Sequence, residues 1–146
     1  MHRQPGPQGC SWWAGGMLAP YCEGESAEEP VVRLGQKAAD WWAQHTTSLQ
    51  RCGSLVVSPA RDTSDLTRFA RRTQSHKTLT AAEIEALEPD LGDRFATGLF
   101  FENEAHLSPR TALAELWRGL VADGATFDQR EADPDARAND GLVIDC

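Results

Sequence analysis

Basic side chains are scarce in this sequence. Its 14 lysines and arginines stand against 22 aspartates and glutamates, which leaves a net charge of -8 over 146 residues. Nucleic acids and anionic membrane surfaces both attract proteins through a basic footprint, so the composition argues against either partner. No run of the chain approaches the roughly 18 apolar residues that a membrane-spanning helix needs. We therefore expect a soluble globular chain, of about one domain's length, that binds neither nucleic acid nor membrane.

Clustered metal ligands are also missing. The four cysteines include no CxxC pair and the four histidines are scattered, whereas zinc sites have short, characteristic ligand spacings. The first nine residues, MHRQPGPQG, carry no apolar segment of the kind that a secretory signal requires. We predict no metal site, no disulfide scaffold and a cytoplasmic location with reduced thiols.

Helical periodicity predicts two helices at the ends of the central region. The first covers residues 28–46 and opens with a capping box of Ser26 and Glu29. The second covers residues 108–123, with Ser108 as its cap, Pro109 in its first turn and Gly124 after its end. Their expected buried stripes are Val31, Leu34, Ala38, Trp41 and His45 in the first helix, widened by Ala39 and Trp42, and Leu113, Leu116, Trp117, Leu120 and Val121 in the second.

Two shorter helices are predicted between them. One starts at Asp62 as N-cap. It places Leu66, Phe69 and Ala70 on a buried face and its arginines on the solvent-exposed face. The other opens with a capping box of Thr80 and Glu83, packs Ile84 and Leu87, and stops before Pro89.

Short β-branched or apolar runs predict strands at CGSLVVSP (52–59) and TGLFFEN (97–103), and a weaker one at ATFDQ (125–129). A last strand is expected at residues 142–144. Its continuous apolar character is typical of a strand covered on both faces, as in a parallel α/β sheet. The sequence ends two residues after this strand, and we therefore expect the chain to be part of a longer protein.

The segment SWWAGGMLAP (11–20) combines residues that suit contact with a flat heteroaromatic group. Gly15 and Gly16 permit positive φ and close approach of the backbone, whose N–H groups can donate to ring nitrogens or carbonyl oxygens. Met17 supplies an adaptable wall, and Trp12 and Trp13 supply large apolar faces. The same residues suit a surface loop whose tryptophans are anchored in the core, and residue chemistry alone favours that interpretation.

Five segments, in order, resemble D-amino-acid-oxidase-type flavoproteins, and most of all the glycine oxidases associated with thiamine biosynthesis. SWWAGGMLAPYCEGESAEEP is similar to the segment of that family that runs past the flavin ring. GSLVVSP resembles its first substrate-domain strand, and LTAAEIEALEPDL its short helix ending in Glu-Pro. GLFFENEAHLSPRTAL resembles a strand, turn and helix entry, and GLVIDC the strand that returns to the cofactor domain. The resemblance spans roughly residues 10–146.

The resemblance implies FAD as cofactor and a partial two-domain fold, α/β overall and α+β in the substrate-domain part. Residues 1–9 are then an irregular N-terminus, 10–46 the flavin-contacting loop and helix of the FAD domain, and 47–105 part of the substrate domain. Residues 106–146 are the helix and strands that return to the FAD domain.

The resemblance also implies which residues contact the cofactor. They are Ser11, Ala14, Gly15, Gly16 and Met17, and Met17 would also border the substrate pocket. No catalytic side chain is predicted. At His106 we prefer a structural cap of the following helix to a chemical role, and we interpret Arg110 as solvated.

The implied reaction is oxidative deamination of a small amino acid with dioxygen, which gives an imino acid and hydrogen peroxide. The chain contains neither the G-x-G-x-x-G strand and turn that holds a dinucleotide's pyrophosphate nor the family's substrate-carboxylate arginine, so we expect it to be inactive alone. Two alternatives remain. One is a non-catalytic remnant that self-associates or binds a partner strand through an exposed edge at residues 142–146. The other is an unrelated small α+β binding domain.

Overall fold

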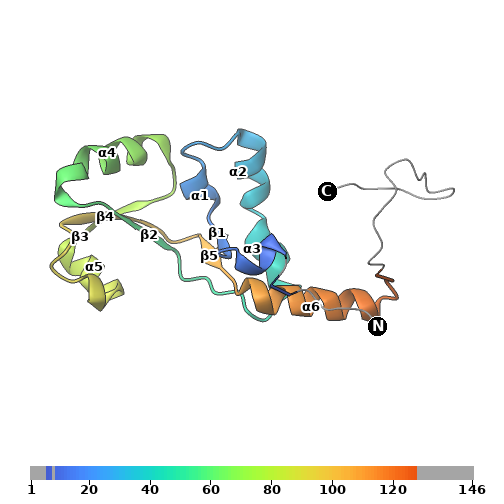
Figure 1. Ribbon diagram of the computed structural model, residues 1–146. Coiled ribbons are helices and arrows are strands. Elements are labelled where there is room, and N and C mark those ends of the chain that lie inside the picture. Colours follow the sequence, from blue (N-terminus) through green and yellow to red (C-terminus); the bar gives the residue numbers. More distant parts are fainter. Residues whose placement is uncertain (1–5, 8, 128–146) are drawn as a thin grey trace.

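The computed structural model describes residues 6–7 and 9–127, which form two connected groups of elements (Figure 1). One group is a three-stranded sheet with two helices. Its elements are β2 (Ser54–Val57), α4 (Thr63–Arg72), β3 (Lys77–Thr80), α5 (Ala81–Leu87) and β4 (Thr97–Phe101), with short 3-10 turns η2 (Ala60–Asp62) and η3 (Pro89–Leu91).

The second group is mainly helical and holds the N-terminal segment. Its elements are η1 (Cys10–Trp13), β1 (Met17–Leu18), α1 (Pro20–Glu23), α2 (Glu29–Gly35), α3 (Ala38–Ala43), β5 (Ala105–His106) and α6 (Pro109–Ala122). β2 and β4 are neighbouring strands of the sheet, and both extend toward this second group. This pair of strands therefore connects the two groups (Figure 1).

The sheet is antiparallel throughout, in the order β2-β4-β3. Ser54 stands opposite Phe101 in the β2–β4 ladder, and Lys77 stands opposite Phe100 in the β3–β4 ladder. The strands predicted at 52–59 and 97–103 are therefore confirmed. Mixed helices and antiparallel strands also agree with the α+β character expected for this part of the chain.

The core lies between β4 and α4. Leu66, Leu99 and Phe101 are buried together, and Phe69 meets Phe101 edge-on with ring centroids 6.2 Å apart. This confirms the predicted inner face of α4. Tyr21, from α1, packs against the same cluster, so the N-terminal helix shares the core of the sheet.

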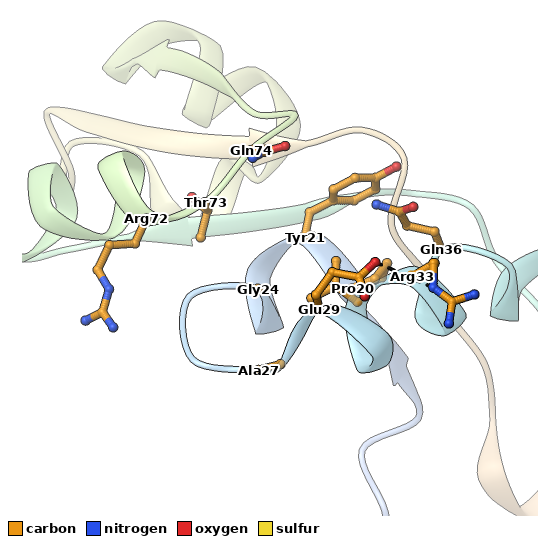
Figure 2. Close-up of a pocket in the computed structure, with 11 residues that line it drawn as sticks. Pro20, Tyr21, Gly24, Ala27, Glu29, Arg33, Gln36, Arg72, Thr73 and Gln74 are labelled. Atoms are coloured by element: carbon orange, nitrogen blue, oxygen red, sulfur yellow. Dashed lines mark ion pairs between the residues drawn. The ribbon is translucent and has the colours of Figure 1, made fainter.

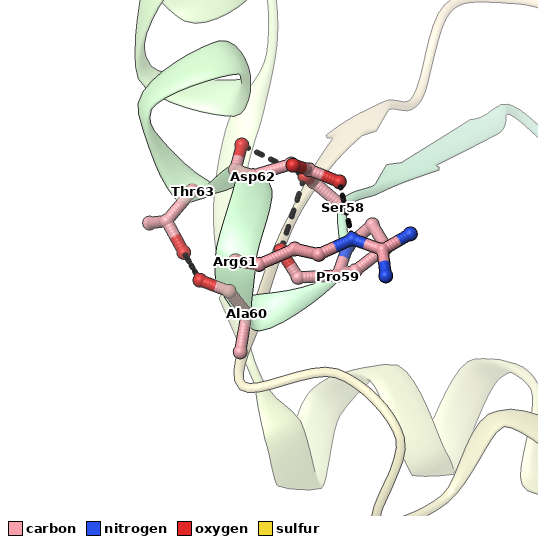
Figure 3. A network of polar contacts seen from close by, with 6 residues as sticks. All are labelled: Ser58, Pro59, Ala60, Arg61, Asp62 and Thr63. Carbon is pink, nitrogen blue, oxygen red and sulfur yellow. Dashed lines mark hydrogen bonds and ion pairs between the residues drawn. The ribbon is translucent and has the colours of Figure 1, made fainter.

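The turn between β2 and α4 is held by its own polar groups (Figure 3). Ser58 Oγ donates to the carbonyl of Asp62 at 2.9 Å, and Thr63 Oγ1 donates to the carbonyl of Ala60 at 2.8 Å. Asp62 occupies the N-cap position of α4 as predicted, but its carboxylate pairs with Arg61 at 3.3 Å and makes no cap hydrogen bond. The helix therefore starts from the local turn rather than from a side-chain cap.

The capping box of α5 is confirmed in both directions. The backbone N–H of Glu83 donates to Thr80 Oγ1, and the Glu83 carboxylate accepts from the backbone N–H of Thr80 at 2.8 Å. Ile84 is buried and the helix ends before Pro89, as predicted. Leu87 is 47% exposed, so its predicted packing is wrong.

The single helix predicted over 28–46 is wrong, because the chain forms α2 and α3 with a turn between them. Gly35, a poor helix former, ends α2, and a Cβ there would lie 2.9 Å from Pro20 Cβ, so this position favours glycine. Ser26 does not cap this helix either, because Glu28 is the N-cap residue and makes no side-chain cap bond.

The predicted stripe on that helix is also wrong in part. Val31 is 58% exposed, Leu34 62% and Trp41 49%, so these members of the stripe are wrong, whereas Ala39 is buried as predicted. Splitting the helix changes the rotation of its second half, so residues spaced for one continuous helix no longer share a face.

The cap of α6 is confirmed: Ser108 Oγ accepts from the N–H of Thr111, and Pro109 stands in the first turn. Gly124 follows the helix end with φ +86°, as predicted. The last part of the predicted stripe is wrong, because Leu120 and Val121 are 47% and 45% exposed. That end of α6 extends away from the other elements (Figure 1).

Residues 125–127 form no strand, so the described part of ATFDQ does not support the weaker strand prediction. The strand expected at 142–144, and the parallel sheet inferred from it, lie outside the described residues. Within the described ranges, none of the helices combines the length and apolar character that crossing a bilayer requires.

Candidate functional site

The N-terminal loop is held against the start of α6 by its tryptophans. The Arg110 guanidinium carbon lies 5.5 Å from the ring centroid of Trp12 and 5.3 Å from that of Trp13. Trp13 also donates its indole N–H to the carbonyl of Pro7 at 2.9 Å. Arg110 is exposed, but the prediction that it is merely solvated is incomplete, because it stacks on both indoles.

The next residues of the loop are fixed by backbone contact. β1 pairs with β5 in an antiparallel ladder, with Met17 opposite His106. The N–H of Leu107 donates to the carbonyl of Gly16 at 2.9 Å. Gly16 has φ +75°, and a Cβ there would lie 2.1 Å from the carbonyl oxygen of Leu107. This position therefore requires glycine for both its conformation and its close approach.

The other predicted cofactor-binding residues of the loop lie on the surface. Ser11, Ala14 and Gly15 are exposed, and Met17 is 64% exposed. A Cβ built on Gly15 would meet nothing within 4 Å. No described residue accepts a hydrogen bond from the N–H of Gly15 or Gly16.

The alternative of tryptophans anchored in the core is wrong for Trp13, which is 65% exposed. Neither indole belongs to the cluster around Phe101. The loop is thus held by its contacts with Arg110 and β5, and not by packing of its indoles in the core.

His106 lies in β5 next to this loop. Its backbone exchanges two hydrogen bonds with Gln50, at 2.8 and 2.9 Å, and its side chain is exposed. The cap of α6 is Ser108 Oγ, so the cap role predicted for His106 belongs to Ser108 instead.

Glu104 was not foreseen from the sequence. Its side chain is 1% exposed, and Oε1 accepts from the backbone N–H of Tyr21 at 3.0 Å and of Cys22 at 2.7 Å. Burial, and then the neighbouring Glu104 carboxylate, raise the pKa of the Cys22 thiol to about 12. No local pattern could have indicated these contacts, because the partners lie 82 and 83 residues apart.

Glu115 was not foreseen either. Its carboxylate accepts from Thr46 Oγ1 at 2.5 Å, from the Thr47 N–H at 2.9 Å and from Thr47 Oγ1 at 2.7 Å. These bonds lower the pKa of Glu115 to about 2 and fasten the end of the α3 segment to α6.

A cavity that could take a small molecule lies elsewhere, between α1 and α2 on one side and the end of α4 on the other (Figure 2). It has a volume of about 560 Å³ and contains none of the five predicted loop residues. Arg72 at its edge is paired with Glu25 at 2.8 Å, and Arg33 with Glu29 at 3.5 Å. Its cationic groups are thus already neutralised.

Among residues 6–7 and 9–127, no three His, Cys, Asp or Glu side chains gather in a group that could hold a metal ion. The loop, by contrast, fits a flat polar ring system. It offers a glycine backbone with open space above Gly15, two N–H groups without a described acceptor, and an exposed methionine at its end.

Residues 1–140 match the family described as FAD dependent oxidoreductase, or DAO. The chain belongs to the FAD-dependent oxidoreductase family. This confirms the resemblance on which the flavin assignment was based, and the family implies FAD as the cofactor.

A Rhizobium etli protein named as a thiamine biosynthesis oxidoreductase, ThiO, is 58% identical over 113 residues. That match covers 77% of this chain but 35% of the relative, so this chain spans about a third of that protein's length.

The solved structures that this family member resembles share its fold. The glycine oxidase of Geobacillus kaustophilus matches with a TM-score of 0.64 at 22% identity, over 84% of this chain and 37% of that one. The iminodiacetate oxidase of Chelativorans sp. BNC1 matches with a TM-score of 0.64 at 22% identity, over 84% of this chain and 38% of that one. The predicted D-amino-acid-oxidase-type fold is therefore confirmed for the part that the chain covers.

Proposed function

We propose that this chain carries the flavin-facing loop of an amino-acid oxidase of the glycine oxidase type. The observation that carries the proposal is the surface at Gly15 and Gly16, where an ordered backbone presents two N–H groups without a described acceptor. Ser11, Ala14, Gly15, Gly16 and Met17 would line the flavin ring. Met17 would also border the substrate.

The loop's chemistry suits this role without an acid–base pair. When bound, the flavin accepts a hydride from the carbon that bears the amine, and dioxygen reoxidises it to give hydrogen peroxide. The chain's own residues would hold and orient the ring through backbone donors, and Met17 would exclude water from one side. A small amino acid is the proposed substrate, which is consistent with the names of the glycine oxidase and iminodiacetate oxidase relatives.

Turnover is proposed for the protein of full family length. This chain spans 35% of the Rhizobium relative, and the dinucleotide-binding motif is not in its sequence. Within the chain, we assign residues 10–46 and 106–146 to the FAD domain and 47–105 to the substrate domain.

The test is a titration of the purified chain with FAD, followed by tryptophan fluorescence and by the flavin's visible absorption. Saturable quenching of Trp12 and Trp13 together with a structured flavin band supports the proposal. An unchanged spectrum with a folded chain contradicts it for this chain.

Two variants make the titration specific. Gly15→Leu places a branched side chain in the open space above the loop, so it should abolish FAD binding while leaving the melting temperature unchanged. Gly119→Leu is the matched control, because a Cβ there also meets nothing within 4 Å but lies on α6. Equal loss of binding in both variants would argue against contact at the loop.

The alternative of a self-associating fragment has one observation in its favour. The edge predicted for it, at residues 142–146, lies outside the described residues, but within them β2 and β3 are also edges of a sheet, with a ladder partner on one side each. Sedimentation of the chain without flavin separates the two: a concentration-dependent dimer that does not bind FAD would support the alternative.

A further inference from the structure

Glu104 is a buried carboxylate in the turn between β4 and β5. A buried carboxylate is costly unless hydrogen-bond donors surround it. Its Oε1 has two, the backbone N–H groups of Tyr21 and Cys22 in the first turn of α1. First-turn N–H groups have no partner within their own helix, so the carboxylate supplies what the helix lacks. Oε2 is buried as well and has no hydrogen-bond partner among the described residues.

The helix that Glu104 holds follows the flavin-facing loop directly. Tyr21 stands three residues after Leu18, the last residue of β1. The side chains of Tyr21 and Cys22 pack on the core of the sheet. The C-terminal end of the loop is therefore held at Tyr21 and Cys22, where backbone N–H groups bind Glu104 and the side chains pack on the core.

Upstream of that point the loop is held by other contacts. Met17 pairs with His106, and the carbonyl of Gly16 accepts from Leu107. These contacts and Glu104 all belong to residues 104–107, a single turn and short strand. The part of the loop from Gly16 onward is thus held by one short segment about 90 residues later in the sequence.

We propose that Glu104 is a positioning residue for the flavin site. It acts through the N–H groups of Tyr21 and Cys22, and it sets where Gly15, Gly16 and Met17 present their surface. The inference rests on the proposed function of the loop. Glu104 itself is not placed in contact with flavin or substrate.

The Cys22 thiol offers a separate report on this contact. Burial and then the Glu104 carboxylate raise the pKa of Cys22 to about 12, so little thiolate is present at neutral pH. Removing the carboxylate charge should lower that pKa and speed alkylation of Cys22. Replacing Cys10, Cys52 and Cys146 by serine makes this reaction readable at one site.

The decisive pair of variants is Glu104→Met and Glu104→Gln. Methionine fills a similar volume but cannot accept the two hydrogen bonds with comparable strength, whereas the glutamine amide oxygen can. The control is Glu102→Gln, which removes an exposed carboxylate two residues away that pairs with Lys77.

Two further readouts are taken on the full 146-residue chain. One is amide hydrogen exchange of residues 17–22, with the amides of β2, β3 and β4 as the measure of intact fold. The other is the FAD titration. We expect Glu104→Met to speed exchange in residues 17–22 alone and to weaken FAD binding about tenfold, the loss expected when hydrogen bonds of ordinary strength are removed. Glu104→Gln should restore both, and Glu102→Gln should change neither.

Several outcomes overturn the inference. Equal behaviour of the methionine and glutamine variants would mean that the acceptor does not matter. Faster exchange with unchanged FAD binding would mean that Glu104 stabilises α1 without positioning the site. If the parent chain binds no FAD, the proposed function fails for this chain. The exchange readout still decides whether Glu104 fixes the loop: unchanged exchange in Glu104→Met overturns it, and selective acceleration supports it.

Discussion

Gly16 carries the tightest steric constraint in the loop, because a Cβ there would lie 2.1 Å from the carbonyl oxygen of Leu107. Its φ of +75° adds a second constraint that L side chains rarely meet. The adjacent Gly15 has neither. Gly16 is thus required by the fold, whereas Gly15 leaves open space above the backbone that a ligand could occupy.

We expect Gly16→Ala to lower the free energy of unfolding by at least the strain of a non-glycine residue at positive φ, about 1–3 kcal/mol. Urea denaturation measures this. Gly15→Ala is the matched control and should change stability by less than about 0.5 kcal/mol. A larger loss at Gly15 than at Gly16 would contradict the described course of the loop.

Glu115 makes stability depend on pH in the acid range. Hydrogen bonds from Thr46 and then Thr47 lower its pKa from 4.5 to about 2. A lowered pKa in the folded state means that the contribution is complete above about pH 4.5 and disappears as the pH falls toward 2. We expect Glu115→Gln to be less stable than the parent chain at pH 6 and to approach it near pH 2. Equal differences at both pH values in urea titrations would contradict this origin.

At the scale of elements, local signals predicted the start of α5 and two strands of the sheet, but the equally local capping box of Ser26 and Glu29 does not form. The capping box of Thr80 and Glu83 is a contact between residues three apart, and α5 begins directly after Thr80, as this box predicts. The strands around Leu55 and Leu99 could be predicted because short β-branched or apolar runs bounded by turn residues are typical of strands.

The break between α2 and α3 could not be predicted in this way. It occurs at Gly35, which lies against Pro20, and periodicity along one segment contains nothing about what another segment brings near it. The exposed Leu34 and Leu120 have the same explanation. A helical stripe predicts a face that can be buried, and other parts of the chain decide whether it is.

The cap of α5 provides a prediction at this scale. Thr80→Ala removes the acceptor for the N–H of Glu83, and we expect it to cost about 1 kcal/mol of unfolding free energy. Thr80→Ser keeps the hydroxyl and should recover most of this loss. Identical stabilities of the two variants, measured by urea denaturation, would show that the box contributes nothing.

At the scale of the whole molecule, the core around Phe101 joins the sheet to the N-terminal helix. Phe101 is 0% exposed, and Tyr21 and Cys22 of α1 pack on its cluster. Phe101→Ala should therefore cost about 3–5 kcal/mol and loosen both groups of elements together. Leu120→Ala is the control: at 47% exposed, it should cost under about 0.5 kcal/mol. Loss of the sheet alone, with α1 still protected from hydrogen exchange, would contradict a shared core.

The candidate site was predictable in part. Ser11 to Met17 could be indicated by their resemblance to flavoproteins, and their chemistry left two interpretations open. The contacts that hold the loop, from Arg110 and Glu104, join residues about 80 to 100 positions apart, and a single sequence carries no signal for such pairs.

The most direct test of the central claim is to follow the backbone amides of Gly15 and Gly16 by nuclear magnetic resonance while FAD is added to the chain. If the loop faces the flavin, both amide signals shift saturably, with those of Ser11 and Met17, at the concentration that quenches tryptophan fluorescence. Shifts confined to the cavity between α2 and α4, or no shifts in a folded chain, would contradict the claim.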